Sequence, residues 1–197
     1  MANDERLETL DLNSTDSANA RESVSFHRRS ELAGVEIRSL KNSARAFRFY
    51  STDFEFLAPI SWHGEIWHRR RQALMDSSTV LSAHPGEVFF TRRVIRPGAA
   101  NFLAIDRDVF HEYLSEHPLP ANKLQLRPLT KMSDSLKDKL LEVFRVVRPG
   151  PSALEIQSAM VEFVAAMVVD LLEESSAGTA NIDSDLRTAQ RVHECLH

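Results

Sequence analysis

Short apolar stretches separated by turn residues fill the chain from residue 25 to residue 106. They are rich in β-branched and aromatic residues and recur about every ten residues, which is typical of an antiparallel sandwich or barrel. We expect turns at His63-Gly64, Pro85-Gly86 and Pro97-Gly98. The predicted strands are Val35–Leu40, Ala46–Tyr50, Phe54–Trp62, Glu65–Arg71, Thr79–Ala83, Glu87–Val94 and Phe102–Ile105.

After Asp106 the apolar residues switch to helical spacing. Asp106 can cap a short helix that runs to about Glu116, and Ser133 can cap a second helix that ends at Pro149-Gly150. The pattern therefore predicts a β-rich first half followed by a helical segment.

The third helix is the best-marked element of the chain. Ser152 and Glu155 form an S-x-x-E capping box. A wide apolar stripe follows, to about Glu174, so the helix either lies on its own barrel or packs on two sides. We favour a helix shared with a second copy of the chain. The predicted dimer contacts are Met160, Phe163, Met167 and Leu171.

The two ends of the chain differ from this central part. Residues 1–24 are polar and acidic, and we expect a loose tail with a short helix at Glu5–Leu12. Ser184–His197 repeats apolar residues at helical spacing, and no Gly, Asn or Pro ends the pattern. We expect a tail (1–24), a β-barrel (25–106), a helical dimerisation segment (107–180) and a linker helix (181–197) leading to a further domain.

Composition narrows the class of protein. Hydrophobic content of 43% and charged content of 26% are ordinary for a globular domain, and the net charge of −4 argues against a whole-chain nucleic-acid binder. The single cysteine, Cys195, excludes an internal disulfide, and no secretory signal or membrane-length apolar run is present. We expect a cytoplasmic protein without membrane contact.

Charge is unevenly distributed along the chain. Residues 62–96 hold six arginines and three acidic residues, whereas residues 152–197 hold eight acidic residues and two arginines. Each segment is interpreted either as a solvated face or, for the basic segment, as a cationic patch around an anionic ligand.

Three stretches together resemble AraC/XylS-type transcription regulators. Thr79–Glu87 is similar to the family's G-x-hydrophobic-x-hydrophobic-x-P-P-G-E-x-H stretch, and Ile60–Arg71 resembles the paired strands before it. Arg187–His197 resembles the first helix leading into the DNA-binding half. His84 stands at the first of the two prolines and Phe89-Phe90 where a histidine usually follows, so the family's common pocket histidine is not carried over.

The resemblance, which covers residues 25–197, implies a mainly β plus α fold. It would be a cupin-like double-stranded β-helix barrel followed by helices that dimerise. Such a domain would sense an effector and act on DNA only through a helix-turn-helix domain absent from this chain. A natural truncation that forms mixed dimers with intact relatives is a further interpretation, and a small metal-dependent cupin enzyme is the alternative from another class.

Metal binding and catalysis find little support in the residue spacing. His63 and His68 are five positions apart, so on one strand their side chains point to opposite faces, and Glu87 lies three positions from His84. No G-x-S-x-G elbow or Gly-rich phosphate loop is present. We therefore expect no metal, no cofactor and no enzymatic activity.

An effector pocket is the remaining candidate site. A barrel mouth lined by Trp62, Trp67 and Arg69 would offer aromatic walls and a guanidinium, which suits a planar or apolar molecule with a carboxylate. His84 and Arg92 complete the candidate set, because both flank the same predicted turn. The other interpretation is that the tryptophans belong to the core and the arginines to the surface.

Overall fold

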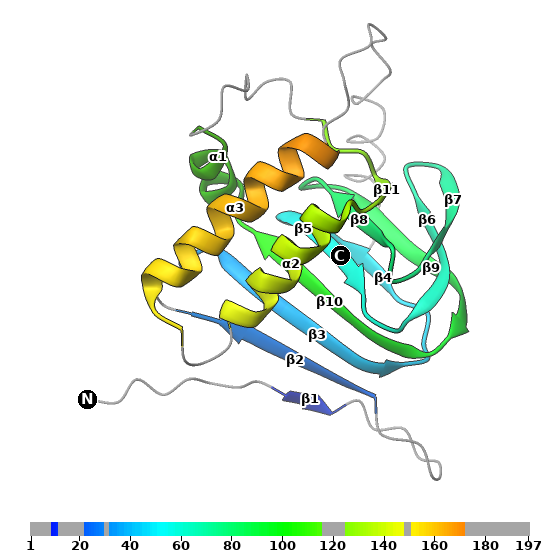
Figure 1. The fold of residues 1–197 in the computed structure, drawn as a ribbon. Helices are drawn as coiled ribbons and strands as arrows, with labels where there is room; N and C mark the ends of the chain where they lie inside the picture. Colours follow the sequence, from blue (N-terminus) through cyan, green and yellow to red (C-terminus); the bar gives the residue numbers. More distant parts are fainter. Residues whose placement is uncertain (1–8, 12–21, 30–31, 116–124, 148–150, 172–197) are drawn as a thin grey trace, which may run out of the picture.

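The computed structural model of the chain describes residues 9–11, 22–29, 32–115, 125–147 and 151–171, which form two antiparallel sheets and three helices (Figure 1). Strands β1-β2-β3-β10-β5-β8-β11 form the larger sheet in that order, and β4-β9-β6-β7 form the smaller one. The strands are β1 (Thr9–Asp11), β2 (Ser23–Arg28), β3 (Val35–Ser43), β4 (Arg48–Tyr50), β5 (Phe54–Pro59), β6 (His63–His68), β7 (Arg71–Met75), β8 (Thr79–Ala83), β9 (Val88–Arg96), β10 (Gly98–Ile105) and β11 (Leu129–Lys131). The helices are α1 (Arg107–Ser115), α2 (Asp134–Val146) and α3 (Ala153–Leu171).

The two sheets pack face to face through apolar side chains. Leu57 and Phe102 of the larger sheet belong to one buried cluster with Ile66 and Phe89 of the smaller sheet. Along β6, buried and half-buried residues alternate, as the two-residue period of a strand requires. Among the described strands no pairing joins the two sheets into one ring, so the predicted closed barrel is corrected to a two-sheet sandwich held by side-chain packing.

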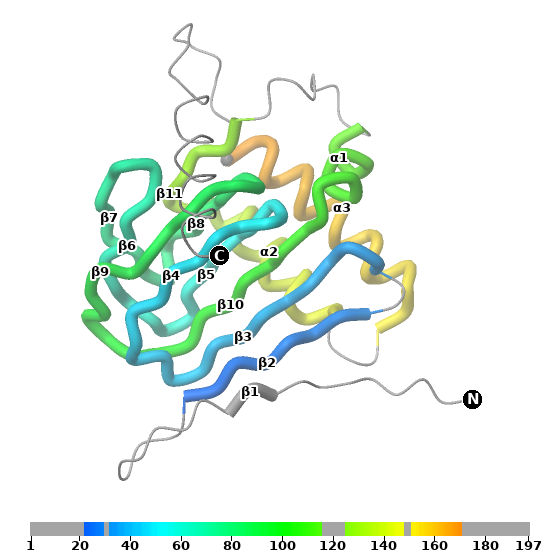
Figure 2. The backbone as a smooth tube through the Cα atoms, turned by 180° about the vertical axis from the view of Figure 1, so that it is seen from behind, coloured from blue at the N-terminus to red at the C-terminus, as the bar shows by residue number. Residues whose placement is uncertain are grey.

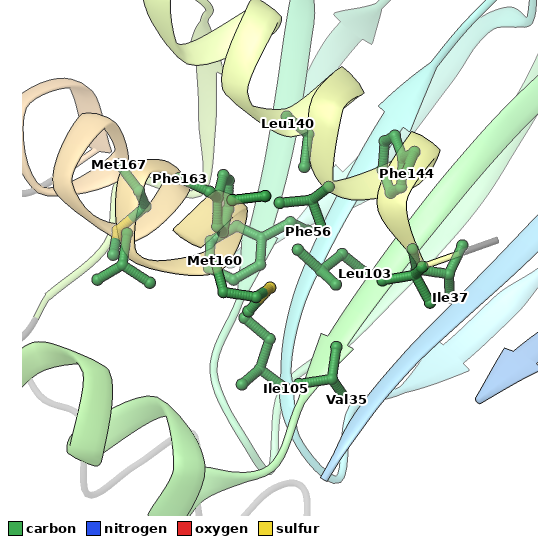
Figure 3. Close-up of a cluster of buried hydrophobic side chains, with 14 of the residues drawn as sticks. Val35, Ile37, Phe56, Leu103, Ile105, Leu140, Phe144, Met160, Phe163 and Met167 are labelled. Carbon is green, nitrogen blue, oxygen red and sulfur yellow. The ribbon is translucent and has the colours of Figure 1, made fainter. Parts of the chain in front are cut away.

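The helices cover the outer face of the larger sheet. Phe56 of β5 meets Phe163 of α3 edge to face, with ring centroids 5.2 Å apart, and Leu103 and Ile105 of β10 lie in the same cluster (Figure 3). Figure 2 shows β2, β3 and β10 side by side with the helices behind them. A three-layer arrangement results, in which the central strands β10, β5 and β8 of the larger sheet are buried on both faces.

All three predicted helix caps are present, and at the start of α1 the carboxylate of Asp106 accepts a hydrogen bond from the Asp108 backbone at 2.9 Å. The hydroxyl of Ser133 accepts a hydrogen bond from the Leu136 backbone at 3.1 Å. Ser152 and Glu155 form the reciprocal capping box, with the Ser152 backbone donating to Glu155 Oε2 at 2.7 Å and the Glu155 backbone to Ser152 Oγ at 3.3 Å. These contacts fix where α2 and α3 begin.

Three details of the predicted strands are wrong. The expected helix at Glu5–Leu12 is contradicted by strand β1, which pairs with β2. The predicted strand Glu65–Arg71 is interrupted by a turn at Arg69-Arg70, after which β7 returns along β6. His63-Gly64 is not a turn, because both residues lie in β6.

Gly64 is required for packing rather than for turning. A Cβ at this position would lie 2.4 Å from Cη2 of Trp62 and 2.8 Å from the Arg93 carbonyl oxygen. Only a glycine leaves room for the indole ring against the strand.

Two predicted features fall on residues that the structure does not describe. The linker helix predicted over 181–197 lies outside them, as does the Pro149-Gly150 stop. Within the part of the chain that the structure describes, no helix is long and apolar enough to cross a bilayer.

Candidate functional site

Charged side chains form a row on the inner face of the larger sheet. In the strand register Arg28 of β2 lies opposite Glu36 of β3, Glu36 opposite Ala104 of β10, and Ala104 opposite Glu55 of β5. Arg38 follows two positions after Glu36 and therefore points to the same side. We call Arg28, Glu36, Arg38 and Glu55 the ionic row.

Arg38 is the central member of the ionic row. Its Nε lies 2.5 Å from Glu36 Oε1, and its Nη1 donates to Glu55 Oε1 at 3.1 Å. Arg28 pairs with the other oxygen of Glu36. Charges of alternating sign on β2, β3 and β5 thus neutralise one another.

Glu55 is the most deeply buried member, with 1% of its surface exposed. Burial raises the pKa of Glu55 above its ordinary value, although the positive charge of Arg38 partly opposes the shift. Its Oε2 finds no hydrogen-bond partner among the described residues. A buried carboxylate oxygen with unused capacity can accept a hydrogen bond from a donor that enters the sandwich.

Two hollows open beside the ionic row and share Arg28, Glu36 and Arg38. One, of about 410 Å³, is mainly polar, and Thr52, Asp53 and Asp106 contribute to it. The other, of about 370 Å³, is mainly apolar. Its remaining lining consists of Val24, Phe26, Leu40, Phe49 and Phe102.

A second polar cluster centres on Glu87 at the β8–β9 turn. Arg69 donates from Nε to Glu87 Oε1 at 2.6 Å and from Nη2 to Oε2 at 3.2 Å, and His68 Nε2 lies 3.1 Å from Oε2. The His84 backbone also donates to Oε2, at 2.8 Å. We call His68, Arg69, His84 and Glu87 the Glu87 cluster.

The Glu87 cluster holds the segment that leads into β11. Arg69 Nη1 donates to the Leu126 carbonyl at 2.8 Å, and the Leu126 backbone donates to His84 Nε2 at 3.2 Å. Because that ring nitrogen accepts, the proton of neutral His84 resides on Nδ1. Both backbone groups of a fully buried residue are thereby satisfied.

Two pKa values in the Glu87 cluster depart from their ordinary range. Burial acts to raise the pKa of Glu87, but hydrogen bonds from His68 and Arg69, together with their charge, overcome it and lower the value to about 2. Burial lowers the pKa of His84 to about 4, against the opposing charge of Glu87. These residues therefore serve a structural, acid-sensitive contact.

The structure does not bring the five candidate ligand residues together. Arg69 and His84 meet in the Glu87 cluster. Trp62 is 1% exposed inside the sandwich core, Trp67 stacks on Phe90 on the outer face of the smaller sheet, and Arg92 is exposed on that face. The expected mouth of Trp62, Trp67 and Arg69 is therefore not formed, because the three side chains point in different directions.

The predicted dimer contacts lie in the core of the chain itself. Met160, Phe163 and Met167 are each 0% exposed and pack between α3 and the larger sheet (Figure 3). This burial leaves none of their surface for a second copy. The side chain of Leu171 lies outside the described part of the structure.

Sequence reasoning missed the ionic row. The only signal was the alternation in Val35–Leu40, where Glu36 and Arg38 interrupt an apolar strand at every second position. That alternation ordinarily marks a face in water. The second sheet, which covers this face, cannot be inferred from the strand alone.

In the described segments, no three His, Cys, Asp or Glu side chains are grouped closely enough to hold an ion.

Comparison with known proteins identifies the fold. No family model and no curated protein matches the sequence. The AraC-like transcriptional activator CuxR aligns with 89% of this chain and 65% of its own, at a TM-score of 0.58 and 13% identity. ToxT from Vibrio cholerae aligns with 82% of this chain and 64% of its own, at 0.51 and 16%.

The fold is that of AraC-like transcription regulators. The resemblance predicted from the sequence is thus confirmed at the level of the fold. A second structure, apo ToxT, agrees, with a TM-score of 0.52 over 82% of this chain. The chain spans just under two thirds of the length of each of these regulators.

Proposed function

We propose that this chain is the regulatory part of an AraC-type transcription regulator and binds a small-molecule effector between its sheets. The observation that carries the proposal is the pair of hollows beside a partly buried ionic row, in a fold shared with such regulators. A chain needing only a packed core would gain stability from apolar residues in place of this row.

The two hollows define the chemistry of the effector. Phe49 and Phe102, with ring centroids 4.8 Å apart, form an aromatic wall, while Arg28 and Glu36 provide charge at the other end. The proposed ligand has an apolar body and a polar head that carries hydrogen-bond donors. Such a head would donate to the carboxylate of Glu36, which lines both hollows.

A route from this site to the helices runs through single strands. Arg38 lines both hollows, and its neighbour Ile37 packs in the helix-facing core. Glu55, the ion-pair partner of Arg38, also has a neighbour in that core, Phe56. A ligand that shifts β3 or β5 therefore alters the surface of the larger sheet against which α2 and α3 pack. This coupling is the proposed regulatory step.

Contact with DNA is assigned to the part of those regulators that lies outside the aligned region. Binding rather than catalysis is assigned to the chain itself.

Dimerisation remains part of the proposal, through a different face of α3. Leu154, Val161, Ala165 and Val169 recur at helical spacing on the side away from the core, and Leu154 and Val169 are 75% and 79% exposed. Such a second apolar stripe fits a helix that packs on two sides.

The test is a thermal-shift screen of compounds with an apolar body and a polar head, followed by calorimetry on the hits. A ligand at about 100 times its Kd stabilises the fold by about 2.7 kcal/mol. We expect hits to lose affinity in Phe49→Ala and to keep it in Lys137→Ala, an exposed change on α2. Hits that bind Phe49→Ala equally well would contradict a site in the hollows.

A further inference from the structure

Residues 126–133 form a strap that runs along one edge of β8 and leads into α2. Within the strap, β11 pairs with β8 and is the last described strand of the larger sheet (Figure 1). Hydrogen bonds continue on both sides of β11. The Ser82 backbone donates to the Pro128 carbonyl at 3.0 Å, and the Met132 backbone donates to the Ser78 carbonyl at 2.9 Å. The backbone of the strap is therefore bonded to β8 and the turn before it along most of its length.

Side-chain burial within the strap is uneven. Leu126 is 0% exposed, whereas Arg127, Lys131 and Ser133 are exposed and the remaining residues are half-buried. A three-residue edge strand with few buried side chains opens at a lower free energy than the central strands of a sheet. Contacts at the ends of the strap therefore decide how firmly it is held.

The first end of the strap is held by the Glu87 cluster. Arg69 donates to the Leu126 carbonyl, and the Leu126 backbone donates to the ring of His84. Arg69 and His84 are both bonded to the carboxylate of Glu87 in turn. One buried leucine and one carboxylate thus join the strap to the turns that follow β6 and β8.

The turn that presents Arg69 is unfavourable by itself. Arg69 and Arg70 form the two-residue turn between β6 and β7, with φ angles of 46° and 61°. Glycine and asparagine favour this left-handed region, whereas a long side chain is disfavoured there. The hydrogen bonds of Arg69 to Glu87 and Leu126 compensate for this cost. Their loss should let the turn relax and withdraw the guanidinium from the strap.

The second end of the strap is held by α3. Ser133, the N-cap of α2, donates from its backbone to Asp170 Oδ2 at 3.0 Å. Asp170 is the next-to-last residue of α3, and its charge also favours the positive end of the α2 dipole. A single contact therefore joins the end of the strap, the start of α2 and the last turn of α3.

We propose that the strap is a conformational device that couples the Glu87 cluster to the end of α3. In its closed state the contacts at both ends hold it against β8. When the contacts to Glu87 are lost, the strap detaches from β8 as one unit and the Asp170 contact is lost with it, while the two sheets stay folded. The inference does not rest on the effector proposal, because neither the strap nor the Glu87 cluster contributes a residue to the hollows.

Acid provides one way to open the strap. The ring of His84 accepts the Leu126 hydrogen bond only while it is neutral. Among the described residues, the charged and titratable groups that face it are Glu87, whose charge favours protonation, and Arg69 and His68, which oppose it. Protonation removes the acceptor, so opening should increase as the pH falls.

Amide hydrogen exchange, followed by NMR on the full chain, tests the coupling. Glu87→Gln should accelerate exchange of the Leu126, Met132 and Ser133 amides by a similar factor of about ten or more, as for loss of a hydrogen bond to a charged group. The Phe102 amide in the centre of the larger sheet should exchange as in the unmodified chain. Exchange at Ser133 is the decisive readout, because its partner is Asp170 and not Glu87.

Reciprocity provides a second readout. Asp170→Ala removes the contact at the far end and should accelerate exchange at Leu126, since coupling between two sites acts equally in both directions. Glu65→Gln is the matched control, because it breaks an ion pair with Arg93 on the smaller sheet without touching the strap. Arg69→Lys keeps the charge but loses the forked geometry, and it serves as the second variant if Glu87→Gln does not fold.

A disulfide that fixes the strap on β8 separates coupling from general destabilisation. Thr79 and Lys131 lie directly opposite each other, so cysteines at these two positions are within reach of a disulfide. With Cys195→Ser in the background, the oxidised Thr79→Cys, Lys131→Cys chain should no longer show faster Ser133 exchange when Glu87→Gln is added. Reduction of the same protein should restore the effect.

Three results would overturn the proposal. Faster exchange at Leu126 alone, with Met132 and Ser133 unchanged, would show a local contact without coupling. Equal acceleration at Phe102 would show that the whole fold is destabilised and that the strap is no separate unit. Unchanged exchange at every amide would show that the Glu87 cluster does not hold the strap.

Discussion

Arg38 and Glu55, on two strands separated by β10, are joined by an ion pair of 3.1 Å. Glu55 is buried and Arg38 half-buried, with side-chain exposures of 1% and 19%. The pair joins β3 to β5, the two strands whose residues Ile37 and Phe56 pack against the helices on the other face. Its integrity is therefore central to both stability and the proposed regulation.

Replacing one partner of this pair should lower the free energy of unfolding more than replacing both. Arg38→Met leaves Glu55 buried without its partner, and we expect a loss of about 3–5 kcal/mol in the free energy of unfolding. The double variant Arg38→Met with Glu55→Leu should recover most of that loss, because no buried charge remains at Glu55. Urea unfolding of both variants and the unmodified chain measures the difference. A double variant as unstable as the single one would contradict the pairing.

The Glu87 cluster predicts acid sensitivity. The pKa of Glu87 is lowered to about 2 and that of His84 to about 4, so the unfolded chain binds more protons than the folded chain at acidic pH. The stabilisation by both groups is complete above about pH 6.5, falls first as His84 is forced to protonate, and falls further below about pH 4.5 through Glu87. Thermal unfolding between pH 7 and pH 3 should show this decline, and Glu87→Gln should flatten its lower part.

The two faces of α3 should respond differently to charge. Met167→Glu places a carboxylate in the core and should destabilise the fold by several kcal/mol. Val169→Glu lies on the exposed face. It should leave the melting temperature nearly unchanged and shift the apparent mass in solution from dimer towards monomer. Light scattering and thermal unfolding separate the two effects. An unchanged dimer mass for Val169→Glu and Leu154→Glu would rule out the proposed contact face.

Gly64 predicts a steric effect. Gly64→Ala would place a methyl group 2.4 Å from Trp62 and 2.8 Å from the Arg93 carbonyl, and we expect a loss of about 1–3 kcal/mol. The exposed change Ser77→Ala is the control. Stability equal to that of the unmodified chain would show that the indole ring moves freely, which its burial argues against.

Some parts of the site could be predicted and others could not. The stretch Thr79–Ala83 was predicted with the bounds that the structure gives β8, since its composition and flanking turn are local signals. Trp62 and Trp67 were predicted to line one site because the two-residue alternation of each strand was assumed to continue across the turn between them. Their true separation onto opposite faces depends on the path of the chain between β5 and β6, which side-chain periodicity does not record.

The sequence by itself determined the class of fold. It also determined the starts of the three described helices, because capping acts within three residues of the chain. Only the tertiary structure decided the turn at Arg69-Arg70, where both residues have positive φ without being glycine. Its stabilising contacts come from Glu87 and Leu126, which are 18 and 57 residues away from Arg69. The ionic row was decided in the same way, since the second sheet buries a face that the strand pattern assigns to water.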